Sequence, residues 1–217
     1  MEPQAESEQR ISVVVVDDDR SAREALRLLL QGPEIDVLAL CESPEECLDA
    51  IVAKPPQVAL VDMRMQGDPY AGVALIRQIR ALSPATACLA LTASDRRGDL
   101  LPKAFYAGAH GYYRKGYVLG DELPRIVRRL AEGAWEMDPE MAERILRDVA
   151  VNETRAPFTP HERDMLRRIA SGATADALAA TFHERPSTIR TSIRNIMDKA
   201  QAASAAENDL FSIRYHE

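Results

Sequence analysis

Four apolar runs in the first 115 residues each lead into polar side chains that phosphoryl chemistry could use. The runs occupy residues 11–16, 57–61, 88–91 and 110–114. The residues that follow them are, in order, Asp17 with Asp18, Asp62, Thr92 and Lys115. If the runs are parallel strands of one sheet, their carboxyl ends share an edge, which is where open α/β sheets place their sites.

This set of side chains predicts a carboxylate that accepts a phosphoryl group. Such a transfer needs a positioned nucleophile, for which we expect Asp62, and cations that neutralise the phosphoryl oxygens. Asp17 and Asp18 crowd that nucleophile with like charge, which costs energy unless a divalent cation binds. Mg²⁺ suits an all-oxygen site of this kind. We expect Lys115 to supply a point charge to the phosphate and the Thr92 hydroxyl to donate to it.

The segments between the runs have the spacing of amphipathic helices that would position these residues. Apolar residues recur at helical intervals in residues 21–31, 44–53, 72–82, 99–107 and 121–132. Residues 34–40 add a further predicted strand. Alternation of strand and helix predicts a (βα)5 α/β domain with a five-stranded parallel sheet over residues 11–133. We interpret residues 1–10 as a flexible tail, and residues 134–157 as a linker helix, beginning near Asp138, followed by a linker.

The strand patterns end after residue 157, and a small all-α domain is predicted for residues 158–217. Thr159 and Glu162 have the spacing of a capping box at the start of a helix. A short helix over residues 175–181, a turn and a longer basic helix over residues 186–199 have helix-turn-helix geometry.

Composition restricts the class of protein. The net charge is −7, and residues 157–217 hold 8 basic and 8 acidic residues, so any nucleic-acid contact must come from a local patch. No apolar run approaches the length of about 18 residues that a membrane span requires, so we expect no membrane contact. The chain has 3 cysteines, an odd number without metal-ligand spacing, which favours reduced thiols and a cytoplasmic location.

Residues 11–133 resemble the receiver domain of bacterial two-component response regulators. The stretches VVVVDDD, ALVDMRM, LALTAS and GYYRKG match the four receiver signatures in order. The resemblance implies that Asp62 accepts a phosphoryl group from a sensor histidine kinase. It implies that Mg²⁺ is held by Asp18, Asp62 and the backbone carbonyl of Arg64, with Asp17 assisting through water. It also implies that the phosphorylated form is bound by Thr92 and Lys115 and sensed by the switch aromatic Tyr112.

One departure from the receiver pattern borders the predicted site. The loop after Asp62, which includes residues 65–72, lacks the usual proline and is longer than in the family. The sequence therefore leaves the access to the site and the metal geometry open.

Residues 158–204 resemble the LuxR/FixJ-type helix-turn-helix domain, which places the chain in the NarL/FixJ group. Arg190 and Arg194 are four residues apart and share one helical face. The resemblance assigns double-stranded DNA contacts to Thr188, Arg190, Thr191, Ser192 and Arg194. Glu184 and Asp198 stand where the family has an apolar and a basic residue.

The leading hypothesis is a transcription regulator whose phosphorylation on Asp62 controls homodimerisation and DNA binding, either through a dimer contact or by releasing the recognition helix. We expect no enzymatic turnover beyond slow self-phosphorylation and self-dephosphorylation. An alternative is a phospho-regulated protein-binding signalling module with a degenerate DNA-binding domain, which Glu184, Asp198 and the zero charge of the C-terminal part motivate. A third hypothesis, an aspartyl phosphatase, is disfavoured because Arg64 replaces the second Asp of the usual Asp-x-Asp motif.

Overall fold

The computed structural model describes residues 10–93, 100–117, 122–137, 158–170, 173, 175–189, 191–196, 198, 199 and 202. In chain order the elements of the N-terminal part are β1 Ile11–Val16, α1 Arg20–Leu29, β2 Ile35–Cys41, α2 Pro44–Ala53, β3 Val58–Asp62, α3 Ala71–Leu82, β4 Ala87–Thr92, α4 Leu100–Ala107, β5 Gly111–Arg114, the 3-10 turn η1 Lys115–Tyr117, α5 Glu122–Ala131 and β6 Glu136–Met137. The predicted (βα)5 alternation is confirmed.

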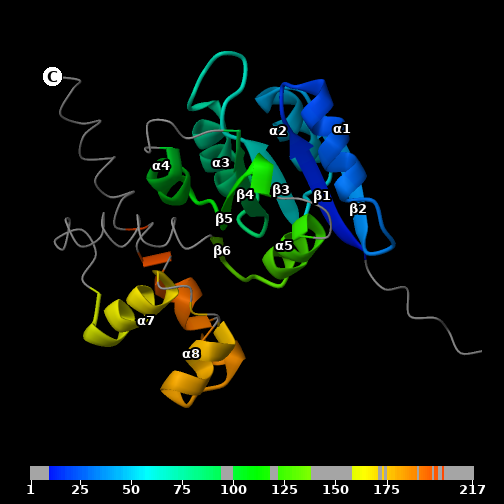
Figure 1. The fold of residues 1–217 in the computed structure, drawn as a ribbon. Helices are drawn as coiled ribbons and strands as arrows, with labels where there is room; N and C mark the ends of the chain where they lie inside the picture. Colours follow the sequence, from blue (N-terminus) through cyan, green and yellow to red (C-terminus); the bar gives the residue numbers. More distant parts are fainter. Residues whose placement is uncertain are drawn as a thin grey trace, which may run out of the picture.

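All strand pairs are parallel, and the strand order is β2-β1-β3-β4-β5-β6 (Figure 1). Successive side chains of a strand point to opposite faces, so each central strand contributes to two cores. Val13 and Val15 of β1 pack with apolar residues of α1 and α5. Val14 and Val16 pack on the other face with residues of α2, α3 and α4. The sheet is therefore the middle of three layers, as in other doubly wound domains.

Local side-chain caps explain where two of the helices begin. The Asp19 carboxylate accepts a hydrogen bond from Ala22 N–H at 3.0 Å, at the start of α1. The Ser43 hydroxyl accepts from Glu46 N–H at 3.2 Å at the start of α2, where Pro44 occupies the first helical position. Both arrangements satisfy backbone donors that have no partner inside the helix.

The sheet has a sixth strand, which the sequence did not predict. Gly111 and Tyr112 of β5 pair with Glu136 and Met137 of β6. The predicted five-stranded sheet is therefore extended by one strand. This strand was not predicted because two residues are too few to show an alternating pattern. The linker helix expected from Asp138 onward lies outside the described residues.

The elements described in the C-terminal part are all helices. Helix α7 covers Pro160–Ala170 and α8 covers Ala175–Phe182, and residues 186–189 and 191–196 are also helical. The predicted capping box forms at the start of α7: Glu162 N–H donates to the Thr159 hydroxyl, and Thr159 N–H donates to the Glu162 carboxylate. The buried residues of this part are Phe158, Met165, Leu166, Leu178, Ala179, Ile189 and Ile196.

Two compositional expectations can be compared with the structure. Cys41, Cys47 and Cys88 are free and buried, as expected for thiols packed as small apolar groups. Within the described ranges, every helix is too short or too polar to cross a membrane.

Candidate functional site

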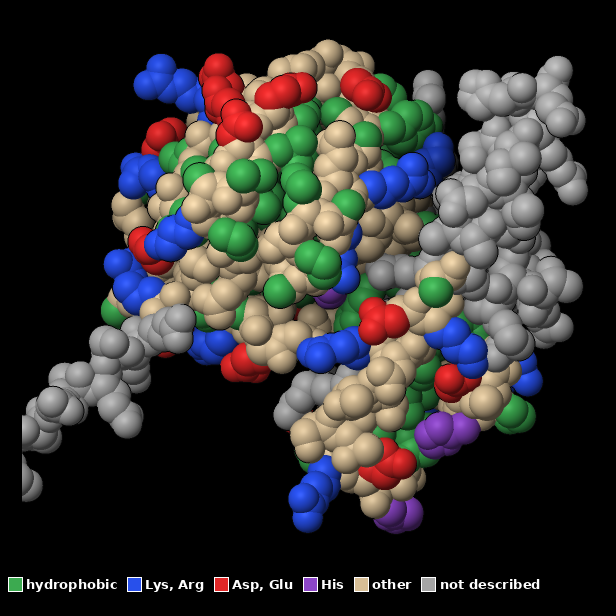
Figure 2. Space-filling view, turned by 180° about the vertical axis from the view of Figure 1, so that it is seen from behind, with side chains coloured by type: hydrophobic (Ala, Val, Ile, Leu, Met, Phe, Trp, Pro, Cys, Tyr) green, Lys and Arg blue, Asp and Glu red, His purple; other side chains and the backbone are tan. Residues whose placement is uncertain are grey.

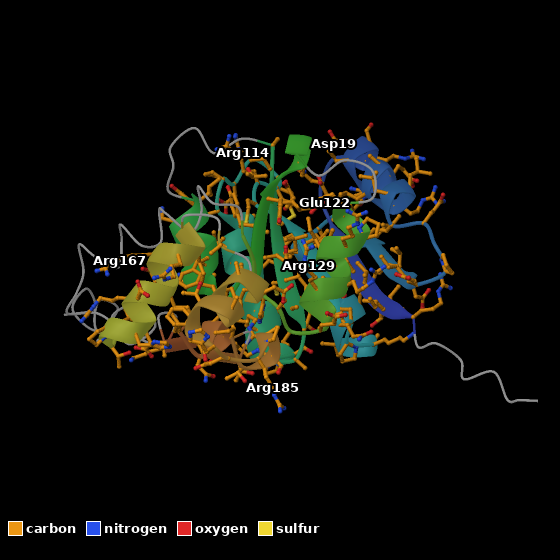
Figure 3. The ribbon with its side chains drawn as sticks, turned by 60° about the horizontal axis from the view of Figure 1, so that its bottom comes forward. Asp19, Arg114, Glu122, Arg129, Arg167 and Arg185 are labelled. Atoms are coloured by element: carbon orange, nitrogen blue, oxygen red, sulfur yellow. The ribbon has the colours of Figure 1, made fainter. Side chains whose placement is uncertain are left out.

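The carboxyl ends of four neighbouring strands bring the predicted site residues together. Asp17 follows β1, Asp62 ends β3, Thr92 ends β4 and Lys115 follows β5. The ladder places Asp62 beside Leu91 and Thr92 beside Arg114, so these strand ends are in register. Asp19 comes shortly after β1, and Arg114 is the last residue of β5. Figure 3 shows the two residues at the same end of the molecule. Acidic side chains gather at the upper end of the molecule in Figure 2, the end to which the β3–α3 loop projects in Figure 1.

Three carboxylates form the acidic cluster that the sequence predicted. Asp17, Asp18 and Asp62 each offer an oxygen, and these atoms lie within 4.8 Å of one another. Asp17 is 1% and Asp62 6% exposed, whereas Asp18 is exposed. Burying two negative charges side by side is costly without a cation between them.

Lys115 supplies a cation to two of these carboxylates. Its ammonium lies 2.5 Å from Asp17 Oδ2 and 2.8 Å from Asp62 Oδ1. Burial raises the pKa of the Asp62 carboxyl, and the negative charge of Asp17 raises it further. The hydrogen bond and positive charge of Lys115 lower it, but the net shift of the Asp62 pKa is upward. Burial lowers the pKa of Lys115, but the hydrogen bonds to Asp17 and Asp62 outweigh this effect and hold its pKa above the usual value.

The donor set is consistent with Mg²⁺. It consists of carboxylate oxygens only, and hard divalent cations prefer such ligands. Arg64 N–H donates to Asp62 Oδ2 at 3.3 Å, which orients the carboxylate from the following turn. The predicted role of the Arg64 carbonyl stays a prediction.

The residues predicted to respond to phosphate lie in the same sheet. Thr92 is fully buried at the end of β4. Tyr112 is 3% exposed on the neighbouring strand β5, beside Ala90 of β4. Thr92 lies one residue beyond Leu91, the ladder partner of Asp62, whereas Tyr112 lies two strands away from β3. The role of both residues in a switch stays a prediction.

The loop after Asp62 contributes a contact that the sequence analysis missed. Gln66 N–H donates to Asp18 Oδ2 at 2.7 Å. Gln66 and Gly67 have φ angles of 53° and 81°, both in the left-handed region. Gly67 was the available signal, because glycine favours tight turns of this kind.

Gly72 lets the first turn of α3 approach the end of β3. A Cβ at this position would lie 2.3 Å from the Asp62 carbonyl oxygen and 2.7 Å from Met63 Cα. Such distances exclude any other residue without a backbone shift, so glycine here lets α3 lie close to the peptide between Asp62 and Met63.

The predicted DNA-contacting residues lie in the helical segment after α8. Thr188, Thr191 and Arg194 are exposed and Ser192 is half-buried, whereas Arg190 lies outside the described residues. The Thr191 hydroxyl donates to the Ser187 carbonyl at 3.1 Å. Arg194 Nη2 donates to the Gly133 carbonyl at 2.6 Å, so this arginine contacts the segment between α5 and β6.

Comparison with known proteins decides the family. Residues 13–127 match the family model of the response regulator receiver domain. Over 208 residues the chain is 30% identical to the probable transcriptional regulatory protein NarL of Mycobacterium tuberculosis, a match that covers 92% of this chain and 94% of that protein. The chain belongs to the NarL/LuxR-type response regulators.

Further relatives of this response regulator agree with that assignment. It is 27% identical to the transcriptional regulatory protein UhpA of Escherichia coli, over 91% of this chain and 95% of that one. The solved receiver domain of Mycobacterium tuberculosis NarL matches with a TM-score of 0.53 and 28% identity, over 58% of this chain and 98% of that one. RcsB of Salmonella typhimurium shares the fold at a TM-score of 0.53 and 23% identity, over 88% of this chain and 92% of that one. The family is one of transcriptional response regulators and not of metabolic enzymes.

Proposed function

We propose that this response regulator accepts a phosphoryl group on Asp62 from the phosphohistidine of a sensor kinase and thereby controls its own dimerisation and DNA binding. The observation that carries the proposal is the convergence of Asp17, Asp18, Asp62 and Lys115 at the carboxyl edge of the sheet. The relatives named as transcriptional regulators support the output.

The charges around Asp62 suit an in-line phosphoryl transfer to this residue. As the bond between an Asp62 oxygen and phosphorus forms, the bond between phosphorus and the imidazole nitrogen of the donor breaks. The Lys115 ammonium is already 2.8 Å from Asp62, so it can form an ion pair with a phosphoryl oxygen once the phosphoryl group is on Asp62. Asp17, Asp18 and Asp62 would hold Mg²⁺, which when bound supplies positive charge to the carboxylate and phosphoryl oxygens.

Intact-mass spectrometry after incubation with acetyl phosphate and Mg²⁺ tests the acceptor. We expect the wild type to gain the mass of one phosphoryl group, and Asp62→Asn to gain none. Asp49→Asn is a matched control, because it removes an exposed carboxylate on α2 that lies outside the acidic cluster. Labelling of Asp62→Asn to the wild-type level would contradict the proposal.

The C-terminal helices are proposed to bind double-stranded DNA through Thr188, Arg190, Thr191, Ser192 and Arg194. Exposed side chains at Thr188, Thr191 and Arg194 support this assignment. Gel shifts on fragments selected from the genome, with and without acetyl phosphate, test it. We expect Arg190→Ala with Arg194→Ala to lose binding. Arg167→Ala with Arg168→Ala, which removes the same two charges from α7, should keep most of it.

Absence of sequence-dependent DNA binding in both phosphorylation states would favour the alternative, a protein-binding module. Phosphorylation of Asp62 would then remain and only the output would differ, so the two experiments separate the two halves of the proposal.

A further inference from the structure

The loop that follows Asp62 is a tight hairpin turn in this chain. Met65 N–H donates to the Asp68 carbonyl at 3.2 Å, and Asp68 N–H donates to the Met65 carbonyl at 2.9 Å. The two central residues, Gln66 and Gly67, both have positive φ angles. Two reciprocal hydrogen bonds around two left-handed residues define a type I′ turn.

Both ends of this turn are anchored. Met65 is 1% exposed and belongs to the core formed with α2, α3 and α4. On the other side, Tyr70 N–H donates to the Asp68 carboxylate at 2.8 Å, a local contact that closes the loop before α3. The direction of the Gln66 peptide is therefore set by the turn.

The Gln66 peptide N–H is directed at the acidic cluster. It donates to Asp18 Oδ2 at 2.7 Å, the short distance typical of a hydrogen bond to a charged acceptor. The other two carboxylates, Asp17 and Asp62, are held by Lys115. Asp18 is exposed, so its side chain keeps rotational freedom unless a neighbour holds it.

We propose that the Gln66–Gly67 turn is a positioning element for the metal site: its backbone fixes the Asp18 carboxylate, leaving Oδ1 for the cation. The inference rests on the proposed function only in requiring that the acidic cluster binds Mg²⁺. Partners that orient a ligating side chain typically change metal affinity by about 10–100-fold, because an unfixed ligand must be ordered when the metal binds.

Gly67 offers a clean way to disturb the turn. A Cβ added at Gly67 would meet nothing within 4 Å, so a substitution there acts through the backbone and not through packing. Gly67 has a φ of 81°, which a β-branched residue strongly disfavours and asparagine tolerates. Gly67→Val should open the turn, and Gly67→Asn should preserve it.

Calorimetric titration of the full chain with Mg²⁺, without phosphodonor, is the test. We expect Gly67→Val to weaken Mg²⁺ binding by about tenfold, and Gly67→Asn to stay within about twofold of the wild type. Gln66→Gly, which keeps the N–H and removes the backbone strain, should bind at least as tightly as the wild type. Urea denaturation of each variant shows that the fold is retained, and Gly67→Ala provides a milder step if Gly67→Val is unstable.

The outcomes separate the two proposals. Wild-type Mg²⁺ affinity in Gly67→Val and Gly67→Ala would overturn the role of the turn and leave the phosphoacceptor intact. Equal weakening in Gly67→Val and Gly67→Asn would also overturn it, because the glycine itself and not the turn would then matter. A wild type that binds no Mg²⁺ would overturn the metal cluster of the proposed function together with this inference.

Discussion

The ammonium of Lys115 lies between two buried carboxylates, 2.5 Å from Asp17 and 2.8 Å from Asp62. The Lys115 side chain is 22% exposed, whereas the two acids are almost completely covered. One cation thus compensates two buried charges at the carboxyl ends of β1, β3 and β5.

Lys115→Met should destabilise the metal-free protein by about 3 kcal/mol, because removing one member of a buried ion pair leaves the partner charge uncompensated. Urea denaturation in a chelator measures this loss. Added Mg²⁺ should restore part of the stability of Lys115→Met, and Lys115→Arg should lose less than Lys115→Met. Equal unfolding free energies for the wild type and Lys115→Met in chelator would show that the pair contributes nothing.

Glu136→Gln should weaken the attachment of β6. The Glu136 side chain is 11% exposed. Its carboxylate accepts hydrogen bonds from Arg129 at 2.5 and 2.7 Å and from the Tyr113 hydroxyl at 3.3 Å. Loss of the charge should cost about 2 kcal/mol in unfolding free energy, the range of charge-assisted hydrogen bonds.

Glu122→Gln is the matched control for Glu136→Gln. Glu122 lies on the same helix as Arg129 (Figure 3). It contacts Arg129 at 3.6 Å, and its side chain is 41% exposed. Such surface pairs contribute about 0.5 kcal/mol. Similar losses in the two variants, measured by urea denaturation, would contradict the importance of burial.

His110 should make the stability of this protein fall with acidity. Burial and the nearby guanidinium groups of Arg80 and Arg194 lower its pKa to about 3 in the folded chain. Its Nδ1 accepts a hydrogen bond from Cys88 N–H at 3.1 Å, which a protonated Nδ1 could not do. The unfolded chain, with a pKa of about 6.5, binds the proton more tightly, so stability is complete above about pH 6.5 and lost as the pH falls toward 3.

This effect amounts to about 2 kcal/mol of unfolding free energy between about pH 7 and about pH 5. His110→Asn keeps an acceptor near the Cys88 amide but cannot titrate. The pH profile of its unfolding free energy, from urea denaturation, should therefore be shallower than that of the wild type by this amount. Parallel profiles would exclude His110 as the source.

Gly133→Ala should release Arg194 from the receiver. Gly133 has a φ of 79°, and a Cβ there would lie 1.8 Å from Arg194 Nη2. An arginine that donates to the Gly133 carbonyl is not available to DNA, so the unphosphorylated variant should bind selected DNA fragments several-fold more tightly. Gly32→Ala is the control, because a Cβ there has open space. Unchanged affinity in a gel shift of Gly133→Ala would dismiss this contact as a restraint on binding.

The sheet and its acidic edge could be predicted because apolar runs followed directly by polar residues are strong local patterns. Val13–Val16 leads straight into Asp17, and the capping box of Thr159 and Glu162 formed as expected. The Gln66 contact could not be predicted in this way: Gly67 signals the turn, but nothing in the sequence signals that a backbone N–H will meet a carboxylate 48 residues away. The strand at Glu136 was missed because pairing across the sheet, and not local periodicity, determines it.

The pairing of Tyr112 with Met137 makes β5 an interior strand. The bare amides and carbonyls of an outer strand are a template on which a foreign strand can add. Here the His110 carbonyl accepts a hydrogen bond from Glu136 N–H at 2.9 Å, so the outer edge of β5 is already paired with β6 of the same chain. A receiver domain truncated after Gly133 would lack β6 and expose the edge of β5. Self-association of such a fragment through β5 would be an effect of the truncation and would not report how the intact regulator assembles.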